Sequence, residues 1–231
     1  IEVPTDNNGM IMEELEKFLH QYNLKVTAIG TGQAWGEEGL SFTDPDPDIR
    51  KAAIQRIQSH VPIAEKLNAV IIIGLVRGIL KPGVSHPQAM DWLREALQQC
   101  TSVAKDNNVC LALEPINRYE TSLINNVTQG MDLISEVNAD NFGLLLDTFH
   151  MNIEEPQIEE SIQLCGNRIF HFHVADSNRW YPGGGHLDFG SILTSLFNTG
   201  YTGYVSGEFL PYPNVDTAAQ KSILHLRKVK Q

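Results

Sequence analysis

Acidic and histidine side chains stand at the C-terminal ends of four successive segments that read as β-strands. The segments are LALEP (111–115), LLLDTFH (144–150), FHFHVAD (170–176) and VSGEF (205–209). Successive side chains along a strand point to opposite faces, so each segment has one small or polar face and one large apolar face. Glu114, Asp147, His173 and Glu208 take the small or polar face. We therefore expect these four side chains to converge at one mouth of a parallel sheet.

Three carboxylates and one imidazole form a ligand set that is rich in hard oxygen atoms. Such a set suits Mn²⁺, Mg²⁺ or Co²⁺. In a partly dry site, three carboxylates without a counter-charge would repel one another strongly. We therefore predict one divalent metal ion, with Mn²⁺ favoured and Co²⁺ or Mg²⁺ as alternatives. His171, two residues before His173, is interpreted as a core histidine and not as a ligand.

Strand and helix patterns alternate along the whole chain, which indicates an α/β protein with a parallel sheet. The expected strands are 24–30, 69–75, 109–115, 142–148, 168–176 and 201–209. The expected helices are 10–22, 48–67 with a kink at Pro62, one that Pro87 opens, 124–138, 156–165, 190–199 and 215–228. An open doubly wound sheet and a closed barrel both fit this alternation. No helix pattern directly follows the glycines of IGTGQAWG (29–36), and the polar residues gather at strand ends, so the TIM (β/α)8-type barrel is favoured.

Composition excludes several other classes of protein. The 231 residues carry 17 Lys and Arg against 28 Asp and Glu, a net charge of −11, which argues against a nucleic acid partner. The longest apolar run, 69–76, is too short to span a membrane. The three cysteines form neither a disulfide framework nor a metal-binding CxxC motif. We expect a cytoplasmic protein with one domain over residues 1–231.

The strand-end segments carry a resemblance to a known family. LALEPINRYE, LLLDTFHMNIEE and HFHVADSNRW resemble the sugar isomerase/epimerase family with a xylose isomerase-like barrel, and most closely its ketose 3-epimerases. The resemblance implies that Glu114, Asp147, His173 and Glu208 hold one divalent metal ion. It implies an acid/base pair, Glu114 and Glu208. It also implies three sugar-holding residues, which are Glu120, His150 and Arg179. A homo-oligomer, dimer or tetramer, is expected as well.

This resemblance predicts an isomerase that inverts C3 of a ketose or of a keto-sugar acid. Inversion through a cis-enediolate needs one carboxylate to remove a proton from one face and a second to return a proton on the opposite face. Metal binding to the ketone oxygen and its neighbouring hydroxyl stabilises the enediolate. Arg77 and Arg179 would suit a sugar that carries a carboxylate.

Alternatives of other classes remain at this point. A 1,2-isomerase similar to hydroxypyruvate isomerase needs proton transfer on one face only. A metal nuclease of the AP-endonuclease type would require more histidines at the mouth and a basic rim. A sugar-binding protein without catalysis has no use for two opposed carboxylates on a cation.

The N-terminus departs from the family pattern. IEVP (1–4) resembles the end of the second barrel strand, so the first strand and helix of the barrel are expected to be absent from this chain. Either a longer natural chain or a partner subunit would then complete the barrel.

Overall fold

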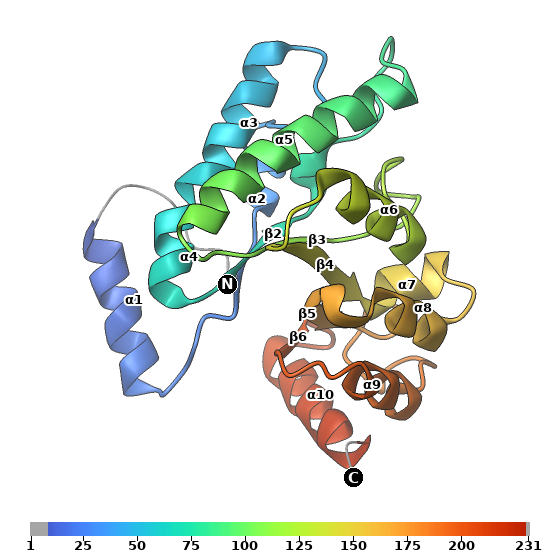
Figure 1. Cartoon of the computed structure of the whole chain (residues 1–231). Helices are drawn as coiled ribbons and strands as arrows, with labels where there is room; N and C mark the ends of the chain where they lie inside the picture. The colour runs from blue at the N-terminus through green and yellow to red at the C-terminus, as the bar shows by residue number, and fades with distance from the viewer. Residues whose placement is uncertain (1–8, 230–231) are drawn as a thin grey trace. The chain divides into compact units, whose positions relative to one another are not determined.

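A computed structural model describes residues 9–229 of the chain (Figure 1). These residues divide into two compact units. The first unit extends to Leu111 and includes Ala139–Asn141, and the second comprises Ala112–Asn138 and the chain from Phe142 onward. The single barrel domain expected over residues 1–231 stays a prediction. IEVP lies outside the described residues.

The first unit contains the blue-to-green elements of Figure 1. In chain order they are α1 (Gly9–Gln21), β1 (Ala28–Ile29), α2 (Gly32–Gly36), α3 (Pro47–Ser59), α4 (Val61–Leu67), β2 (Val70–Ile73), the 3-10 helix η1 (Leu75–Arg77) and α5 (His86–Asp106). Strand β1 pairs with β2 in parallel, with Ala28 opposite Val70. Helix α3 packs against α5, and α4 packs against β2.

The second unit contains the remaining elements. They are β3 (Leu111–Leu113, whose first residue belongs to the first unit), α6 (Val127–Val137), β4 (Phe142–Asp147), α7 (Thr148–Glu154), α8 (Ile158–Cys165), η2 (Gly166–Arg168), β5 (Ile169–Val174), α9 (Phe189–Asn198), β6 (Val205–Gly207) and α10 (Val215–Val229). Strand β5 pairs in parallel with β4 on one side and with β6 on the other. Helix α8 packs against both α6 and α9.

Each of the six expected strands is present, although shorter than expected, and the pairings observed within the units are parallel and join consecutive strands. All six residues of β4 are buried, as expected for a strand covered on both faces. No helix among residues 9–229 combines the length and the apolar character needed to cross a membrane.

The helices differ from the expectation in three places. The single helix expected over 48–67 is two helices, α3 and α4, which meet at His60, and Pro62 stands in the first turn of α4, where its missing N–H costs nothing. A five-residue helix, α2, follows the glycine-rich turn after β1, where none was expected. Helix α7 was also missed, because its seven residues, which directly follow β4, are too few to show a helical period.

Candidate metal and active site

The second unit brings the four predicted metal ligands together at the C-terminal ends of its strands. Glu114 follows β3, Asp147 ends β4, His173 lies near the end of β5, and Glu208 follows β6. The register places Asp147 directly opposite His173. One potential ligand atom from each of the four residues lies within 4.8 Å of the others. The arrangement follows from the parallel strands, since their carboxyl ends share one edge of the sheet.

Asp147 uses its two carboxylate oxygens in different ways. Oδ1 accepts hydrogen bonds from the backbone N–H groups of Phe149 at 2.8 Å and His150 at 3.1 Å, and so caps α7. Oδ2 is 3.9 Å from His173 Nδ1, too far for a hydrogen bond. Among residues 9–229, neither of these two buried atoms has a hydrogen-bond partner. Asp147 Oδ2 and His173 Nδ1 are therefore two neighbouring buried polar atoms that no described residue satisfies with a hydrogen bond.

The two outer carboxylates differ in exposure. The Glu114 side chain is 8% exposed, whereas the Glu208 side chain is 46% exposed. Glu208 Oε2 is 3.5 Å from His173 Nδ1 and 3.8 Å from an Arg179 guanidinium nitrogen. Loss of hydration opposes ionisation of Glu208, but the neighbouring His173 ring and the Arg179 charge hold the pKa of Glu208 below its ordinary value. Glu208 is thus a carboxylate at neutral pH.

The pKa of Asp147 shifts in the opposite direction from that of Glu208. Burial raises the pKa of Asp147 above its ordinary value, although the nearby His150 and His173 rings act against the shift. The Glu208 carboxylate adds to the increase. The His150 and His173 rings therefore do not offset the effect of burial on Asp147.

The three predicted sugar-holding residues belong to one hydrogen-bonded group around Asn117. Asn117 Nδ2 donates to Glu120 Oε1 at 2.9 Å and lies 2.7 Å from His150 Nδ1. Glu120 Oε1 also accepts from Arg179 at 3.1 Å. His150 Nε2 points toward Glu114 Oε1, 3.8 Å away. Burial lowers the pKa of His150, so the ring is neutral at pH 7.

Arg179 lies on the loop after β5, and the loop holds its backbone in an unusual conformation. Its φ angle is +60°, in the left-handed region that residues other than glycine rarely adopt. Its N–H donates to the Asp176 carbonyl at 2.7 Å, and its carbonyl accepts from Leu210 N–H at 2.8 Å. The guanidinium group stands 4.9 Å from the centre of the Phe149 ring. These contacts direct the charged group toward Glu120 and Glu208.

The Asp176 carboxylate accepts hydrogen bonds from backbone N–H groups along this loop. Asp176 is fully buried, and the donors are the N–H groups of Ser177 at 2.8 Å, Gly183 at 2.8 Å and Leu187 at 3.1 Å. Asp176 lies within the HFHVAD segment and Asn117 within EPINRYE, but no role was predicted for either residue from the sequence. The available signal was that each is a polar residue close in sequence to a predicted ligand. The residues that they contact lie on other segments, and no local sequence pattern shows that these segments come together.

His171 lies below His173 on β5 and does not join the ligand cluster. It is 2% exposed, and its Nε2 lies 3.1 Å from Ser206 Oγ. Burial lowers the pKa of His171 to about 4. This environment agrees with the interpretation of His171 as a core histidine.

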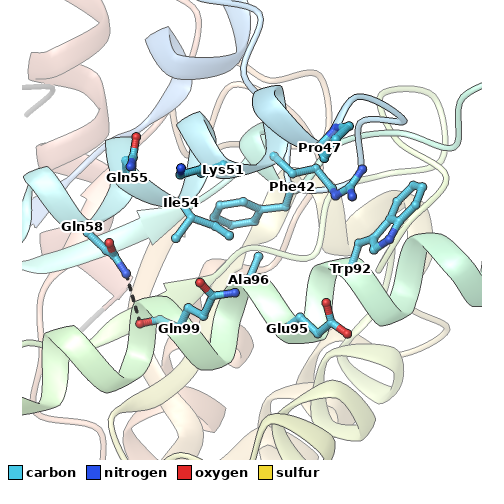
Figure 2. Close-up of a pocket in the computed structure, with 11 residues that line it drawn as sticks. Phe42, Pro47, Lys51, Ile54, Gln55, Gln58, Trp92, Glu95, Ala96 and Gln99 are labelled. Atoms are coloured by element: carbon cyan, nitrogen blue, oxygen red, sulfur yellow. Dashed lines mark hydrogen bonds between the residues drawn. The ribbon is translucent and has the colours of Figure 1, made fainter.

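A separate pocket of about 400 Å³ lies in the first unit, along α3 and α5 (Figure 2). Its lining is mixed, with Phe42 and Ile54 beside Gln55, Gln58 and Gln99. Gln58 donates to the Gln99 carbonyl at 3.3 Å across it. The residues that line this pocket include no histidine, cysteine or aspartate, so it offers no ligand set comparable with that of the second unit.

The donor set of the second unit fits a divalent cation. Its three carboxylates and one ring nitrogen converge, and two of the converging atoms are buried without a hydrogen bond to any described residue. Oxygen-rich sites with one imidazole are typical of Mn²⁺, Mg²⁺ and Co²⁺. Glu114, Asp147, His173 and Glu208 would hold the ion. The assignment of these four ligands stays a prediction.

Proteins of similar sequence are named as ketose epimerases. A D-psicose 3-epimerase from Ruminiclostridium cellulolyticum is 34% identical over 200 residues, which cover 84% of this chain and 66% of the relative. An L-ribulose 3-epimerase from Methylomonas sp. is 30% identical over 201 residues, which cover 86% of this chain and 68% of the relative. An L-ribulose 3-epimerase from Mesorhizobium japonicum is 36% identical, and the match spans 51% of its length. The chain thus matches about half to two thirds of these relatives' own length.

Solved structures show the same fold. A D-psicose 3-epimerase from Clostridium cellulolyticum H10 with D-tagatose has a TM-score of 0.83 and 26% identity, over 95% of this chain and 83% of that one. A 3-keto-D-glucoside 4-epimerase from E. coli has a TM-score of 0.84 at 24% identity, over 94% of this chain and 84% of that one, and supports the fold alone. The sequence profile described as xylose isomerase-like TIM barrel matches residues 2–229. The chain therefore belongs to the xylose isomerase-like TIM barrel family.

Proposed function

We propose that this chain catalyses the metal-dependent epimerisation of C3 in a ketose or a keto-sugar acid. One observation carries the proposal. Glu114 and Glu208 come from β3 and β6, the outer strands of the cluster, while Asp147 and His173 come from β4 and β5 between them. This order supplies a carboxylate on each side of the predicted metal site. Names of the similar proteins, which include D-psicose and L-ribulose 3-epimerases, support the same reaction.

Epimerisation next to a ketone requires the removal of a poorly acidic C–H proton. A divalent cation in the site would polarise the ketone and stabilise the negative charge that develops on the sugar. Glu208, ionised and half exposed, is suited to accept the proton on one face. Glu114, buried on the other side, would carry a proton at the start of this turnover and donate it on the opposite face, so that Glu208 ends protonated and Glu114 ionised. The proton that leaves and the proton that arrives thus use different carboxylates, and the configuration at the carbon inverts.

The residues around Asn117 would hold the sugar during this exchange. Arg179 and His150 present donors beside the carboxylates, and Glu120 presents an acceptor. Binding of hydroxyls by several fixed groups lowers the entropic cost of aligning the C–H bond with its base. A ketose with free hydroxyls fits this mixed set, and the Arg179 charge also suits a carboxylate at the end of the sugar.

Deuterium exchange separates the two carboxylates. In Glu208→Gln, Glu114 still removes and returns a proton on its own face, so the variant should exchange deuterium into one C3 epimer without forming the other. Glu114→Gln should show the opposite preference. The measurement is NMR of a panel of ketoses and keto-sugar acids incubated in D₂O with Mn²⁺, with the ion removed by a chelator before each spectrum is recorded. Gln keeps a carbonyl oxygen for the metal, and metal content is measured in each variant.

The same experiment tests the competing 1,2-isomerase. Exchange at C3 with formation of the C3 epimer by the unmodified chain supports the proposal. Exchange at C1 without exchange at C3 would contradict it and favour an aldose–ketose isomerase. Full epimerisation by either glutamine variant would refute the assignment of the two faces.

A further inference from the structure

The orientation of the Asn117 side-chain amide can be established from its neighbours. Asn117 is 2% exposed, and its Oδ1 accepts the Tyr119 N–H at 3.0 Å. Its Nδ2 faces the Glu120 carboxylate at 2.9 Å. A flipped amide would place oxygen against the carboxylate and nitrogen against an N–H group, two repulsive contacts in place of two hydrogen bonds. The amide therefore directs its two N–H bonds toward Glu120 and His150.

This orientation decides which ring nitrogen of His150 carries the proton. His150 Nδ1 lies 2.7 Å from Asn117 Nδ2 and 3.4 Å from the Asn117 backbone nitrogen, and both of these nitrogens are donors. A proton on Nδ1 would place that N–H against two other N–H groups. Nδ1 must accept, and in a neutral imidazole the proton then resides on Nε2.

The protonated nitrogen points into the predicted active site. His150 Nε2 is 3.8 Å from Glu114 Oε1, and α7 holds the ring there because Asp147 Oδ1 accepts the His150 backbone N–H. The separation exceeds hydrogen-bond length, so a sugar oxygen next to the carboxylate could receive this N–H. Nε2 cannot accept a proton from the sugar while it carries its own, and proton removal is left to the carboxylates.

We propose that Asn117 is a positioning residue that fixes His150 as an Nε2–H donor and holds Glu120 with the same amide. The proposal rests on the proposed function, because that function gives the Nε2–H its sugar oxygen. Asn117 also has a structural role, since its side-chain and backbone oxygens accept N–H groups of the 117–121 turn. A test must therefore separate the effect of Asn117 on the 117–121 turn from the effect of its N–H donor on His150.

Asn117→Asp makes this separation. Aspartate keeps the oxygen that accepts the Tyr119 N–H but replaces both donor bonds with an acceptor. The control is Asn125→Asp on the same loop, because Asn125 Nδ2 donates to the carbonyls of Ile116 and Thr121 and not to His150. Each substitution removes the hydrogen bonds that one side-chain amide donates on this loop, and only the first reverses the hydrogen bond at His150.

The measurement is the ¹⁵N spectrum of the histidine rings in the full chain at neutral pH with Mg²⁺, with the His150 signals assigned by their loss in His150→Gln. We expect an unprotonated Nδ1 and a protonated Nε2 in the unmodified chain and in Asn125→Asp. Asn117→Asp should place a proton on Nδ1. It should also lower kcat/KM for the epimerised sugar by about 10- to 100-fold, as loss of a supporting hydrogen bond around a metal site does.

A protonated Nδ1 in the unmodified chain, or an unchanged His150 spectrum in Asn117→Asp, would overturn this inference. The resting spectrum requires no substrate. If the expected tautomer is present and no sugar is epimerised, the proposed function fails while the assignment of the tautomer stands.

Discussion

Asp44 in the first unit and Asp147 in the second are each 2% exposed, but their pKa values shift in opposite directions. Burial opposes ionisation of both. Asp44 is paired with Lys81 and accepts the Asp46 N–H at 2.9 Å, and these contacts hold its pKa below the ordinary value. Among residues 9–229, no lysine or arginine pairs with Asp147 in this way, and burial raises its pKa. The protein thus compensates the buried Asp44 carboxylate with a lysine, and it does not compensate Asp147 in this way.

Asp176 shows a third way to bury an aspartate. Backbone N–H groups surround its carboxylate and, against the effect of burial, hold its pKa below the ordinary value. Compared with Asp44 and Asp176, Asp147 is the one buried in a group of converging acidic residues with an oxygen that no described residue satisfies. The comparison supports the prediction that Asp147 binds a cation from solution, whereas the contacts of the other two aspartates stabilise the fold.

Substitution of Asp147 should have the largest effect, on activity. The asparagine side chain in Asp147→Asn keeps an oxygen that caps α7 but places an amide where Oδ2 would meet the metal. A bound metal ion contributes several kcal/mol to transition-state stabilisation, so we expect epimerisation to fall about 10³-fold. Metal-free Asp147→Asn should unfold at no lower urea concentration than the unmodified chain, because the substitution removes an uncompensated buried charge. A large loss of stability with activity retained would reverse the interpretation of Asp147.

Substitution of Asp176 should affect stability and its pH dependence. Asp176→Asn places an amide NH₂ against at least one backbone N–H, and the unsatisfied donors should lower the free energy of unfolding by about 2–3 kcal/mol at pH 7. Because the folded pKa is below the ordinary value of 3.8, this contribution is present above pH 3.8 and is lost as the pH falls through the folded pKa. Urea titrations from pH 7 toward pH 3 should show the difference between the variant and the unmodified chain shrinking. A difference that stays constant with pH would refute the ionised state of Asp176.

Substitution of Asp44 should have the smallest effect. Asp44→Asn removes the attraction to Lys81, whose side chain is 37% exposed and can return to water. We expect the free energy of unfolding to fall by about 1–2 kcal/mol, with deuterium exchange into the sugar unchanged. A loss of activity as large as that of Asp147→Asn, in a chain that remains folded, would contradict the claim that Asp44 acts in stability and Asp147 in activity.

Strand positions and the convergence of the site could be predicted from the sequence because both depend on short-range patterns. Alternation assigns Glu114 and Asp147 to one face of their strands, and the parallel order brings their ends to one edge. Helix α7 escaped prediction because seven residues, which begin at the capped strand end of Asp147, are too few to show a helical period. Helix α2, whose five residues begin and end with glycine, escaped for the same reason.

The supporting residues could not be predicted because their roles depend on contacts distant in sequence. Asn117 meets His150 33 residues later, and Asp176 meets Leu187 across a loop without regular structure. Glu208 could be assigned to the site, but its 46% exposure depends on what the surrounding loops cover. A local pattern shows which face a side chain takes, and it does not show the partners that this face meets.

Titration of the metal-stripped chain with Mn²⁺, followed by calorimetry, tests the central claim most directly. The account predicts one saturable site per chain in the unmodified protein and in Asp44→Asn. In Asp147→Asn the affinity should fall at least tenfold, and circular dichroism should confirm that all three proteins are folded. No saturable binding in the unmodified chain, or equal affinity in Asp147→Asn, would contradict the claim that the buried Asp147 carboxylate binds a cation from solution.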